Sequence, residues 1–582
     1  MLRLSPCSLS LALAVAACTS SSGGGLDTAY TSSTSTSGEG SESGELEETG
    51  TEETETGTDT DGEPEGEPLR FIAAGSDDAV VLALDLTDPH DIPEAQYLAT
   101  GDGFAGLFGP TPFGTEALTH SGKIQQLRLT AGGELELSPL AEQDGNWLHG
   151  LWFGDQGADA FVSPSDAPLS GSNTLLWVRY DQHGELLGSF DITPPKQPGG
   201  YVSILARSPD SRWVAAAVDA QPNGSWDLYV LPIDVEPGMT VHVDTINLAG
   251  IPPISVASFL SLHLDDQRLV YRREQLPEIF RPVAVDLGNP EAPLASVGTT
   301  LAHTYSITTA PGDASRLLVT NGGSAGYREL RLIELDGPTS AQPPVLITEP
   351  NKPAQENASA LPGTAASGHG FDVLGRIWYV YRDTTQPQLG SVGISLVTVE
   401  DGEVAQRLEL ANLQAGAELD EVLFDPERQL LGFRVYAGNS SSINYVDLSR
   451  DRPASIRVDQ SYEHSGSAPS DHARYGWSAD GSRIAVVGVK QNQAVLHVAE
   501  IGDAAGATVE ITLPEVERTL GYTLEHQPML SPGGDQLLLW YGTPSGLRGL
   551  IHAPTDGSAA GSVVLAPQHA LTSGAYLPHT PE

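Results

Sequence analysis

Residues Ala206–Asp234 read ARSPDSRWVAAAVDAQPNGSWDLYVLPID, and this stretch decides the fold. A short strand leads into a tight Ser-Pro-Asp turn, an apolar strand follows, and a loop leads to a second apolar strand. Two further stretches repeat this order, Gly476–Ile501 and Pro528–Ala553. Proline presets the backbone at the first corner of such a turn, and aspartate bonds its own backbone there. The wholly apolar strands fit sheets that are buried on both faces.

The unit returns about ten times between residue 69 and the C-terminus. Its second apolar strands end at intervals of 43 to 64 residues, near Leu86, Leu129, Tyr180, Ile233, Val285, Leu335, Val399, Leu448, Ile501 and Ala553. A period of this size is typical of a β-propeller, in which about 40–50 residues make one four-stranded blade. The sequence therefore predicts an all-β fold, a single large propeller of ten blades over 69–582. Because the first two units are weak, eight blades with an N-terminal addition is the second interpretation, and two stacked propellers the third.

The first unit begins directly with a strand, Arg70–Ala74, and has no inner strand before it. The segment Ser573–Leu577 follows a complete unit at the other end of the chain. We expect this segment to supply the missing strand and so to close the ring.

The repeated turn resembles that of the TolB-like, WD40-like propeller repeat (PD40), whose pattern is roughly SPDGxxIAF. The resemblance rests on Ser208-Pro209-Asp210-Ser211, Ser478-Ala479-Asp480-Gly481 and Ser531-Pro532-Gly533-Gly534. Degraded copies begin at Leu264, Ala310 and Asp425. The resemblance implies a fold and a habit of binding proteins, and it implies no catalytic set.

The first eighteen residues read as a targeting segment. Arg3 precedes the apolar run Leu9–Ala17, which is too short to span a membrane and suits a signal peptide. The run ends in Val15-Ala16-Ala17-Cys18, which resembles the lipobox of bacterial lipoproteins. That resemblance implies that Cys18 is lipidated, and Thr19 after it favours the outer membrane. The alternative is an ordinary secretory signal with an incidental cysteine.

Residues 19–68 are rich in Thr, Ser, Gly and Glu, contain fourteen Asp and Glu, and have no Lys or Arg. Such a segment buries too little apolar area to offset chain entropy, so we expect a disordered tether between the anchor and the propeller. The whole chain carries a formal charge of −47. A protein this acidic is repelled by nucleic acid, which excludes that class of partner. The only cysteines are Cys7 and Cys18, so the globular part has neither a disulfide nor a cysteine nucleophile.

Two patterns suggest chemistry. Gly322-Gly323-Ser324-Ala325-Gly326 matches G-x-S-x-G, but a nucleophile elbow needs a strand before it and a helix after it. Here the motif falls between two strands of one unit, so we interpret it as a hairpin loop. Five histidines precede the turns of their units, where inner strands line a central channel, and are candidate metal ligands there: His149, His303, His369, His472 and His526. The competing interpretation is that they cap strand ends, and we favour it, with no metal and no cofactor.

Other recurrent residues have structural interpretations. Aspartates at the ends of the second apolar strands read as turn formers: Asp85, Asp181, Asp234, Asp286 and Asp447. An aromatic-rich stretch reads as filling between blades: Phe104, Phe108, Phe113, Trp147 and Trp152. The connection Asn351–Gly368 is a candidate loop for binding at the rim.

The function that these patterns favour is a non-catalytic, lipid-anchored propeller of the cell envelope that binds an envelope protein or an extracellular ligand. The alternative is a metal-assisted hydrolase or lyase that acts on an extracellular polymer through the channel histidines. A purely structural part of an envelope assembly is the third hypothesis.

Overall fold

The computed structural model of the chain describes residues between Arg70 and Leu577, with gaps that include 108–115, 165–173, 248–255, 356–367, 464–472 and 515–526. The predicted signal peptide, Cys18 and the predicted tether lie outside these described residues. Within them the fold is all-β, because the strands form antiparallel sheets, most of them four-stranded. The single helix of the described part is α1 (Val256–Leu260). The expectation of an all-β fold is confirmed there.

The strands of the first half form five sets of four, numbered here as units 1 to 5. Unit 1 has β42 (Leu571–Leu577), β1 (Arg70–Gly75), β2 (Val80–Asp85) and β3 (Ala95–Ala99); unit 2 has β4 (Phe104–Leu107), β5 (Glu116–His120), β6 (Lys123–Leu129) and β7 (Leu135–Pro139); unit 3 has β8 (Asn146–Gly154), β9 (Gly157–Pro164), β10 (Leu176–Tyr180) and β11 (Leu186–Asp191); unit 4 has β12 (Val202–Arg207), β13 (Trp213–Gln221), β14 (Ser225–Pro232) and β15 (Val241–Asn247); unit 5 has β16 (His263–Leu264), β17 (Arg268–Leu276), β18 (Ile279–Asp286) and β19 (Ala295–Ser296).

The second half repeats the arrangement in units 6 to 10, with two extra short strands, β24 and β33. Unit 6 has β20 (Thr304–Ala310), β21 (Asp313–Asn321), β22 (Tyr327–Glu334) and β23 (Val345–Leu346), and β24 (Ala354–Gln355) joins it to unit 7; unit 7 has β25 (His369–Phe371), β26 (Ile377–Arg382), β27 (Val392–Glu400) and β28 (Glu403–Asn412); unit 8 has β29 (Ala417–Asp425), β30 (Leu430–Ala437), β31 (Ser440–Asp447), β32 (Ile456–Arg457) and β33 (Tyr462–Glu463); unit 9 has β34 (Arg474–Trp477), β35 (Arg483–Lys490), β36 (Gln493–Glu500) and β37 (Thr508–Ile511); unit 10 has β38 (Met529–Leu530), β39 (Gln536–Gly542), β40 (Arg548–Pro554) and β41 (Ser562–His569).

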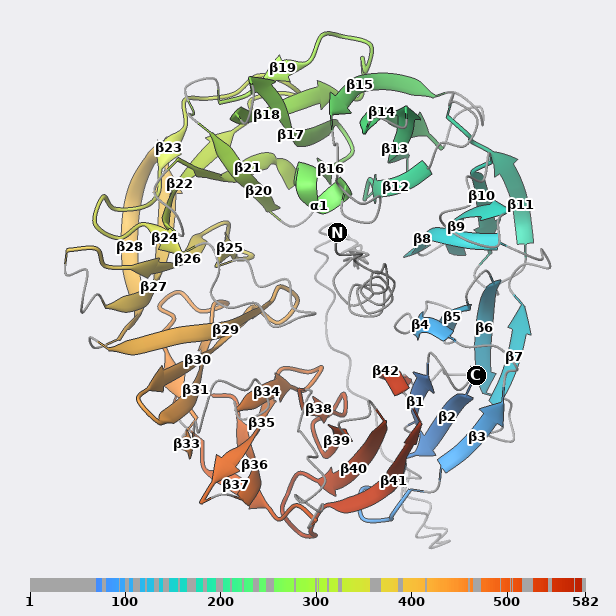
Figure 1. Cartoon of the computed structure of the whole chain (residues 1–582). Coiled ribbons are helices and arrows are strands. Elements are labelled where there is room, and N and C mark those ends of the chain that lie inside the picture. Colours follow the sequence, from blue (N-terminus) through green and yellow to red (C-terminus); the bar gives the residue numbers. More distant parts are fainter. Residues whose placement is uncertain are drawn as a thin grey trace, which may run out of the picture.

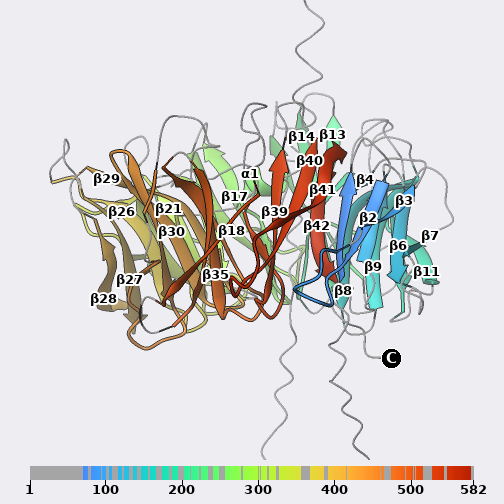
Figure 2. The ribbon, with the colours of Figure 1, turned by 90° about the horizontal axis from the view of Figure 1, so that it is seen from below.

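The units follow one another around a central region, with the first strand of each unit nearest the centre (Figure 1). Seen from the side, the strands run across the thickness of this ring (Figure 2). Each second apolar strand that the sequence predicted is the third strand of its unit, counted outward from the centre. The segment predicted to complete unit 1 also pairs as expected, because β42 is antiparallel to β1, with Arg70 opposite Leu577 and Ala74 opposite Ser573.

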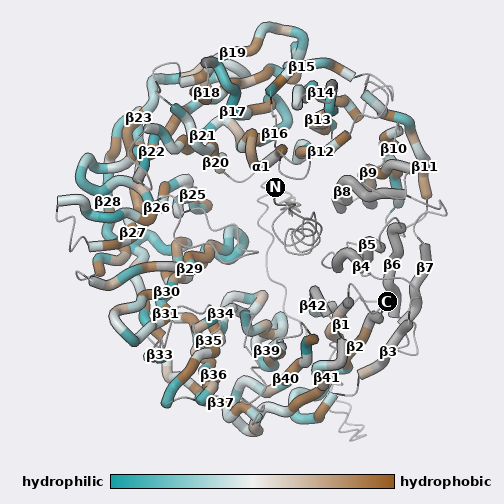
Figure 3. Tube along the Cα trace, in the orientation of Figure 1, coloured by the Kyte–Doolittle hydropathy of each residue, from teal (hydrophilic) through white to brown (hydrophobic). Residues whose placement is uncertain are grey.

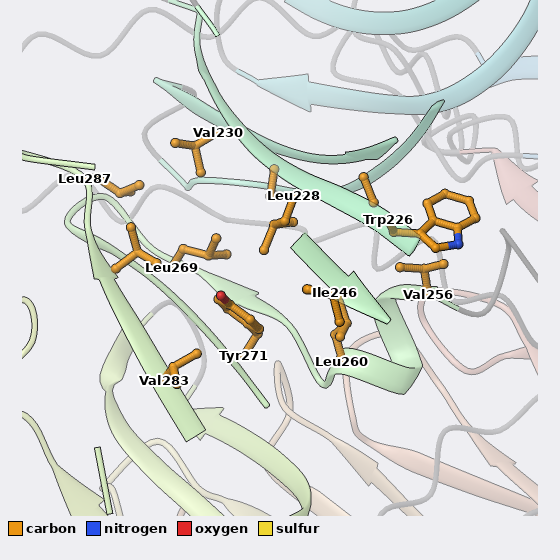
Figure 4. Packing of buried hydrophobic residues seen from close by; sticks show 13 residues of the cluster. Trp226, Leu228, Val230, Ile246, Val256, Leu260, Leu269, Tyr271, Val283 and Leu287 are labelled. Carbon is orange, nitrogen blue, oxygen red and sulfur yellow. The ribbon is translucent and has the colours of Figure 1, made fainter. Parts of the chain in front are cut away.

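Hydrophobic cores lie between consecutive units rather than within one. In β13, Val214, Ala216 and Val218 face unit 3. Ala215 and Ala217, which alternate with them, face unit 5. Side chains of successive strand residues point to opposite faces, so a strand covered on both faces must be wholly apolar. Figure 4 shows the cluster between units 4 and 5, and Figure 3 shows hydrophobic segments recurring in the sheets around the ring.

The same kind of core is present at the other junctions whose side chains are described. Separate clusters join each successive pair from unit 3 to unit 10. Another cluster joins unit 10 to unit 1, where Phe71 and Leu82 pack with Leu538 and Trp540. Phe71 also lies edge-on to Tyr576, with ring centroids 5.3 Å apart. Units 10 and 1 therefore bury apolar area against each other as neighbours in sequence do.

The recurrent turn is built as the sequence predicts. The hydroxyl of Ser478, which has no exposed surface, accepts a hydrogen bond from the Arg483 amide (3.0 Å). The Gly481 amide donates to the Ser478 carbonyl, and Gly481 has φ +71°, a conformation that glycine adopts at little cost. In unit 7 Asp372 takes the place of the serine and accepts from the Arg376 amide (2.8 Å).

The turn-forming role of the strand-end aspartates is confirmed where the structure describes their contacts. Asp85 accepts from the Thr87 amide (3.1 Å), Asp286 from the Gly288 amide (2.8 Å) and Asp447 from the Ser449 amide (3.0 Å). Each carboxylate binds the backbone two residues on, which is the pattern of an Asx turn.

Candidate functional site

The structure describes the side chains of two of the five candidate histidines. His303 precedes β20 and His369 begins β25, and both strands lie on the inner side of the ring (Figure 1). His149 lies in β8, the inner strand of unit 3, but its side chain lies outside the described part. His472 and His526 lie outside the described residues altogether.

Inner strands of three consecutive units are joined by a row of polar contacts, which we call the histidine row. From β16, His263 has Nε2 2.9 Å from the Ile307 carbonyl and Nδ1 3.2 Å from the Thr309 hydroxyl of β20. From the opposite face of β20, the Thr308 hydroxyl lies 3.3 Å from Nε2 of His369 in β25. The alternation of side chains along β20 thus connects unit 6 to unit 5 on one side and to unit 7 on the other.

His369 is only 4 % exposed, and burial lowers its pKa to about 4. Removing an imidazolium from water is costly, so the ring is neutral at physiological pH. A neutral imidazole is a competent metal ligand, yet here its Nε2 faces a threonine of the neighbouring unit. The histidine row therefore ties inner strands together.

His303 belongs to a second feature at the junction of units 5 and 6, the aromatic–arginine stack: Phe259, Arg272, Phe280, His303, Tyr305 and Arg328. The Arg272 guanidinium lies 4.8 Å from the ring centroid of Phe259 and 5.1 Å from that of Phe280, and the two rings contact each other edge to face, with centroids 5.6 Å apart. His303 lies 4.2 Å from Tyr305, centroid to centroid, and the Arg328 guanidinium lies 3.5 Å from the Tyr305 centroid. Cations over aromatic faces attract the ring quadrupole.

The stack is held in place by its backbone contacts and is half-buried. Arg272 donates from Nε to the Phe259 carbonyl (2.5 Å) and from Nη1 to the Tyr305 carbonyl. Nδ1 of His303 accepts from the Phe280 amide (3.4 Å). Phe259, Phe280 and Tyr305 all retain partial exposure. Partly exposed aromatic rings that are already fixed lose little entropy on binding a ligand.

The apparent nucleophile elbow lacks the context of one. Gly322 follows Asn321, the last residue of β21, and has φ +55°. The motif leads into β22, which pairs antiparallel with β21, with Asn321 opposite Glu329. Residues 323–326 lie outside the described residues. A hydrolase elbow joins a strand to a helix, so the interpretation as a hairpin connection is confirmed.

The connection predicted over Asn351–Gly368 is partly structured. Its residues Ala354 and Gln355 form β24, which pairs with both β22 and β26 and so bridges units 6 and 7. Lys352 binds Glu409 (2.5 Å) and lies 4.8 Å from the ring of Tyr381. The first five residues of this connection are therefore engaged in contacts with units 6 and 7, and 356–367 lie outside the described part.

A buried ion cluster between units 8 and 9 was not predicted from the sequence. Glu421 of β29 is 1 % exposed and lies 2.8 Å from Arg434 Nη1 and 3.4 Å from Arg474 Nη1. Its φ of +49° is unusual for a side-chain-bearing residue and falls at a bulge of β29. Charges this deeply buried compensate one another only while all of them are present, because removing one leaves an unpaired charge in the interior. Neither the bulge nor the pairing has a local sequence signal.

Among the described residues no three His, Cys, Asp or Glu side chains are grouped so as to hold a metal ion. No described helix is long and apolar enough to cross a membrane. The aromatic stretch of the sequence analysis begins in β4 with Phe104 and continues in β8 with Trp147 and Trp152, whose side chains lie outside the described part.

No family model matches the chain, and no curated protein matches it in sequence. Several solved structures are similar. A eukaryotic initiation factor is 10 % identical, with 76 % of this chain and 96 % of that one covered and a TM-score of 0.41. An oligogalacturonate lyase in complex with manganese is 12 % identical, covering 73 % and 97 %, with a TM-score of 0.28. TolB from Acinetobacter baumannii is 14 % identical, covering 65 % and 83 %, with a TM-score of 0.23. At such TM-scores none of these likenesses carries an argument about function.

Proposed function

We propose that residues 69–582 form one closed, ten-bladed β-propeller that acts as a non-catalytic binding scaffold for a protein or an extracellular ligand. The pairing of β1 with β42 and the apolar cluster between units 10 and 1 support closure. The ten sets of four strands support the blade number over the eight-bladed alternative.

One observation carries the binding role. The described histidines of β16 and β25 are engaged between units, whereas the aromatic–arginine stack offers partly exposed rings, with two guanidinium groups beside them, in fixed positions at the junction of units 5 and 6. Aromatic and arginine side chains are the residues most enriched where proteins bind one another. We place the contact region of the scaffold at this stack.

The test uses the full chain, purified with its bound partners from membranes. Phe280→Ala and Tyr305→Ala should each reduce the amount of any stoichiometric partner at least tenfold, as truncation of an interface anchor does. Val373→Ala is the control, because Val373 is 67 % exposed in a turn of unit 7, away from the stack. A partner that is retained by both stack variants would contradict this placement.

The metal-assisted hydrolase or lyase remains the competing function, and metal content separates the two. After dialysis the scaffold should retain less than one divalent ion per chain. One tightly held ion per chain that is lost in His369→Ala and His472→Ala would overturn the non-catalytic proposal, because bound metals depend on each of their few ligands.

We further propose that the scaffold is lipid-anchored through Cys18 at the outer membrane, with residues 19–68 as its tether. The residues Val15–Cys18 and the acidic composition of 19–68 support this. Cys18→Ser should move the protein from the membrane fraction to the soluble fraction, because no other lipid attachment is implied. If the variant stays in the membrane fraction, the anchor is elsewhere.

A further inference from the structure

The outer position of unit 8 is occupied by two separate short strands. Asn444 and Tyr445 of β31 pair with Arg457 and Ile456 of β32. Further back along β31, Ser440 and Ser441 pair with Glu463 and Tyr462 of β33. The second piece, Ser461–Glu463, lies against β35 of unit 9, so it covers the junction of the two units. We call these three residues the strap.

The strap is fastened to unit 9 by two side chains. The ring of Tyr462, which is 1 % exposed, lies so close to Gly488 of β35 that a Cβ there would clash with it. The carboxylate of Glu463 accepts from the Gln491 amide (2.8 Å), at a residue with φ +51°. Between them these contacts close the seam over β35 and β36.

Beneath the strap, three titratable side chains are joined in a line. The Tyr462 hydroxyl lies 3.2 Å from Nδ1 of His497, and Nε2 of His497 lies 3.3 Å from the carboxylate of Glu510 in β37. A carboxylate accepts only, so Nε2 carries the proton, and Nδ1 of the neutral ring accepts from the phenol. Glu510 is 60 % exposed, whereas His497 is 1 % exposed.

Other charges act on the same imidazole. Lys490 of β35 disfavours its protonation and Glu510 favours it, but burial is the largest influence and lowers the pKa of His497. Glu463 of the strap binds the backbone beside Lys490. Releasing the strap would expose the imidazole to water and remove the main cause of the lowered pKa.

We propose that Ser461–Glu463 is a pH-sensitive strap, which is docked over the seam between units 8 and 9 while His497 is neutral and is released when His497 takes up a proton. The direction follows from proton linkage. The released state binds a proton at the ordinary pKa of 6.5 and the docked state only at lower pH, so acidification below 6.5 favours release. Because Nδ1 of an imidazolium only donates, the buried phenol hydrogen would also have to find another acceptor.

Hydrogen exchange of the full chain at pH 7.5 and 5.5, corrected for intrinsic rates, tests this. The strap amides that pair with β31 should open up to about tenfold more often at pH 5.5, since one proton is taken up over one unit below 6.5. Pairs between β35 and β36 in the same unit should keep their protection.

Two variants in this line of side chains distinguish pH-dependent release of the strap from a general loss of exchange protection at low pH. His497→Gln keeps a polar amide but does not titrate, so strap exchange should become equal at the two pH values. Glu510→Gln, at the exposed end of the line, should keep the response, because His497 stays buried. A strap that responds equally in His497→Gln would overturn the proposal, as would a uniform rise throughout unit 9. Should His497→Gln not fold, the wild-type comparison of the strap with the β35–β36 pairs decides alone.

Discussion

Units 8 and 9 approach each other closely at a glycine, because this residue has no side chain to keep them apart. Gly432 of β30 faces the rings of Tyr475 and Trp477 on unit 9, and a Cβ built on it would overlap both. The Tyr475 hydroxyl in turn donates to the Glu421 carbonyl at the bulge of β29 (2.6 Å). Tyr475 therefore connects the close approach of units 8 and 9 at Gly432 with the buried ion cluster at Glu421.

Gly432→Ala should lower the free energy of unfolding by about 1–3 kcal/mol, because overpacking forces rings of a full core off their positions. Chemical denaturation measures the change. Gly337→Ala is the matched control, since its Cβ would meet nothing within 4 Å and its φ does not favour glycine. Equal effects at the two positions would show that the ring contacts are not the cause.

Buried histidines make stability depend on pH. Burial lowers the pKa of His369 to about 4, and it lowers that of His552 to the same range. The unfolded chain binds these protons near pH 6.5, so the free energy of unfolding is highest above pH 6.5 and decreases as the pH falls toward 4.

His369 alone should account for about 3 kcal/mol of this decrease. Unfolding followed from pH 7.5 to 4.5 should show the decline, and His369→Gln should flatten it; an unchanged slope in that variant would contradict the assignment.

At the scale of elements, the second strand of each unit from 5 to 10 has, at or near its start, a side chain that reaches the next unit. We call these the anchor residues: Arg268, Arg316, Arg376, Arg428, Arg483 and Gln536. Arg316 donates to the Gly375 carbonyl (3.0 Å) and Arg483 to the Gly534 carbonyl (3.0 Å), each in the turn of the following unit. Gln536 of unit 10 donates to the Leu86 carbonyl of unit 1 (2.5 Å). The junction of the first and last units thus repeats the contact of the others.

Arg376→Met should cost about 3–5 kcal/mol in unfolding free energy, because it leaves Asp372, whose side chain has no exposed surface, as an unpaired buried charge. The methionine keeps the apolar stem, so lost packing is a small part of the effect. Arg331→Met is the control, since Arg331 pairs with the half-exposed Glu329 and such pairs contribute less than about 1 kcal/mol. A loss at Arg376 no larger than that at Arg331 would refute the role of the anchor residues.

The sequence predicted the elements better than their contacts. The Ser-Pro-Asp turn and the apolar strands have local signals, so the strands, their order and the β1–β42 pair were predicted. The anchor residues also have a signal in the sequence, a basic side chain or glutamine three to six residues after the start of the turn. His263 was missed because it lies only two residues before the Asp265 turn. The direction of a side chain on a strand of two or three residues depends on the neighbouring unit, and local pattern does not fix it.

For the whole molecule, removal of β42 should have effects beyond its own seven residues. A chain ending at His569 loses the partner of β1 and the contact of Tyr576 with Phe71, and it bares the edge of unit 1. We expect a lower melting temperature and concentration-dependent association, because an unpaired strand edge is a template for other chains. A chain ending at Leu577 lacks only residues outside the described part and should behave as wild type. If both truncations are equally stable and monodisperse, β42 does not complete unit 1 in solution.

The pairing of β1 with β42 also means that the first strand is synthesised long before its partner. Synthesis proceeds from the N-terminus at roughly 5–20 residues per second, so β1 waits on the order of a minute for a partner about 500 residues away. The distance itself is a minor obstacle, since a loop ten times longer costs only about 2 kcal/mol more to close. The greater risk is association of incomplete chains during this interval, because the edge of β1 is unpaired and apolar until β42 has been made. Fourteen Asp and Glu residues fall in the fifty positions just before that edge, and their like charge opposes the association of nascent chains during this interval.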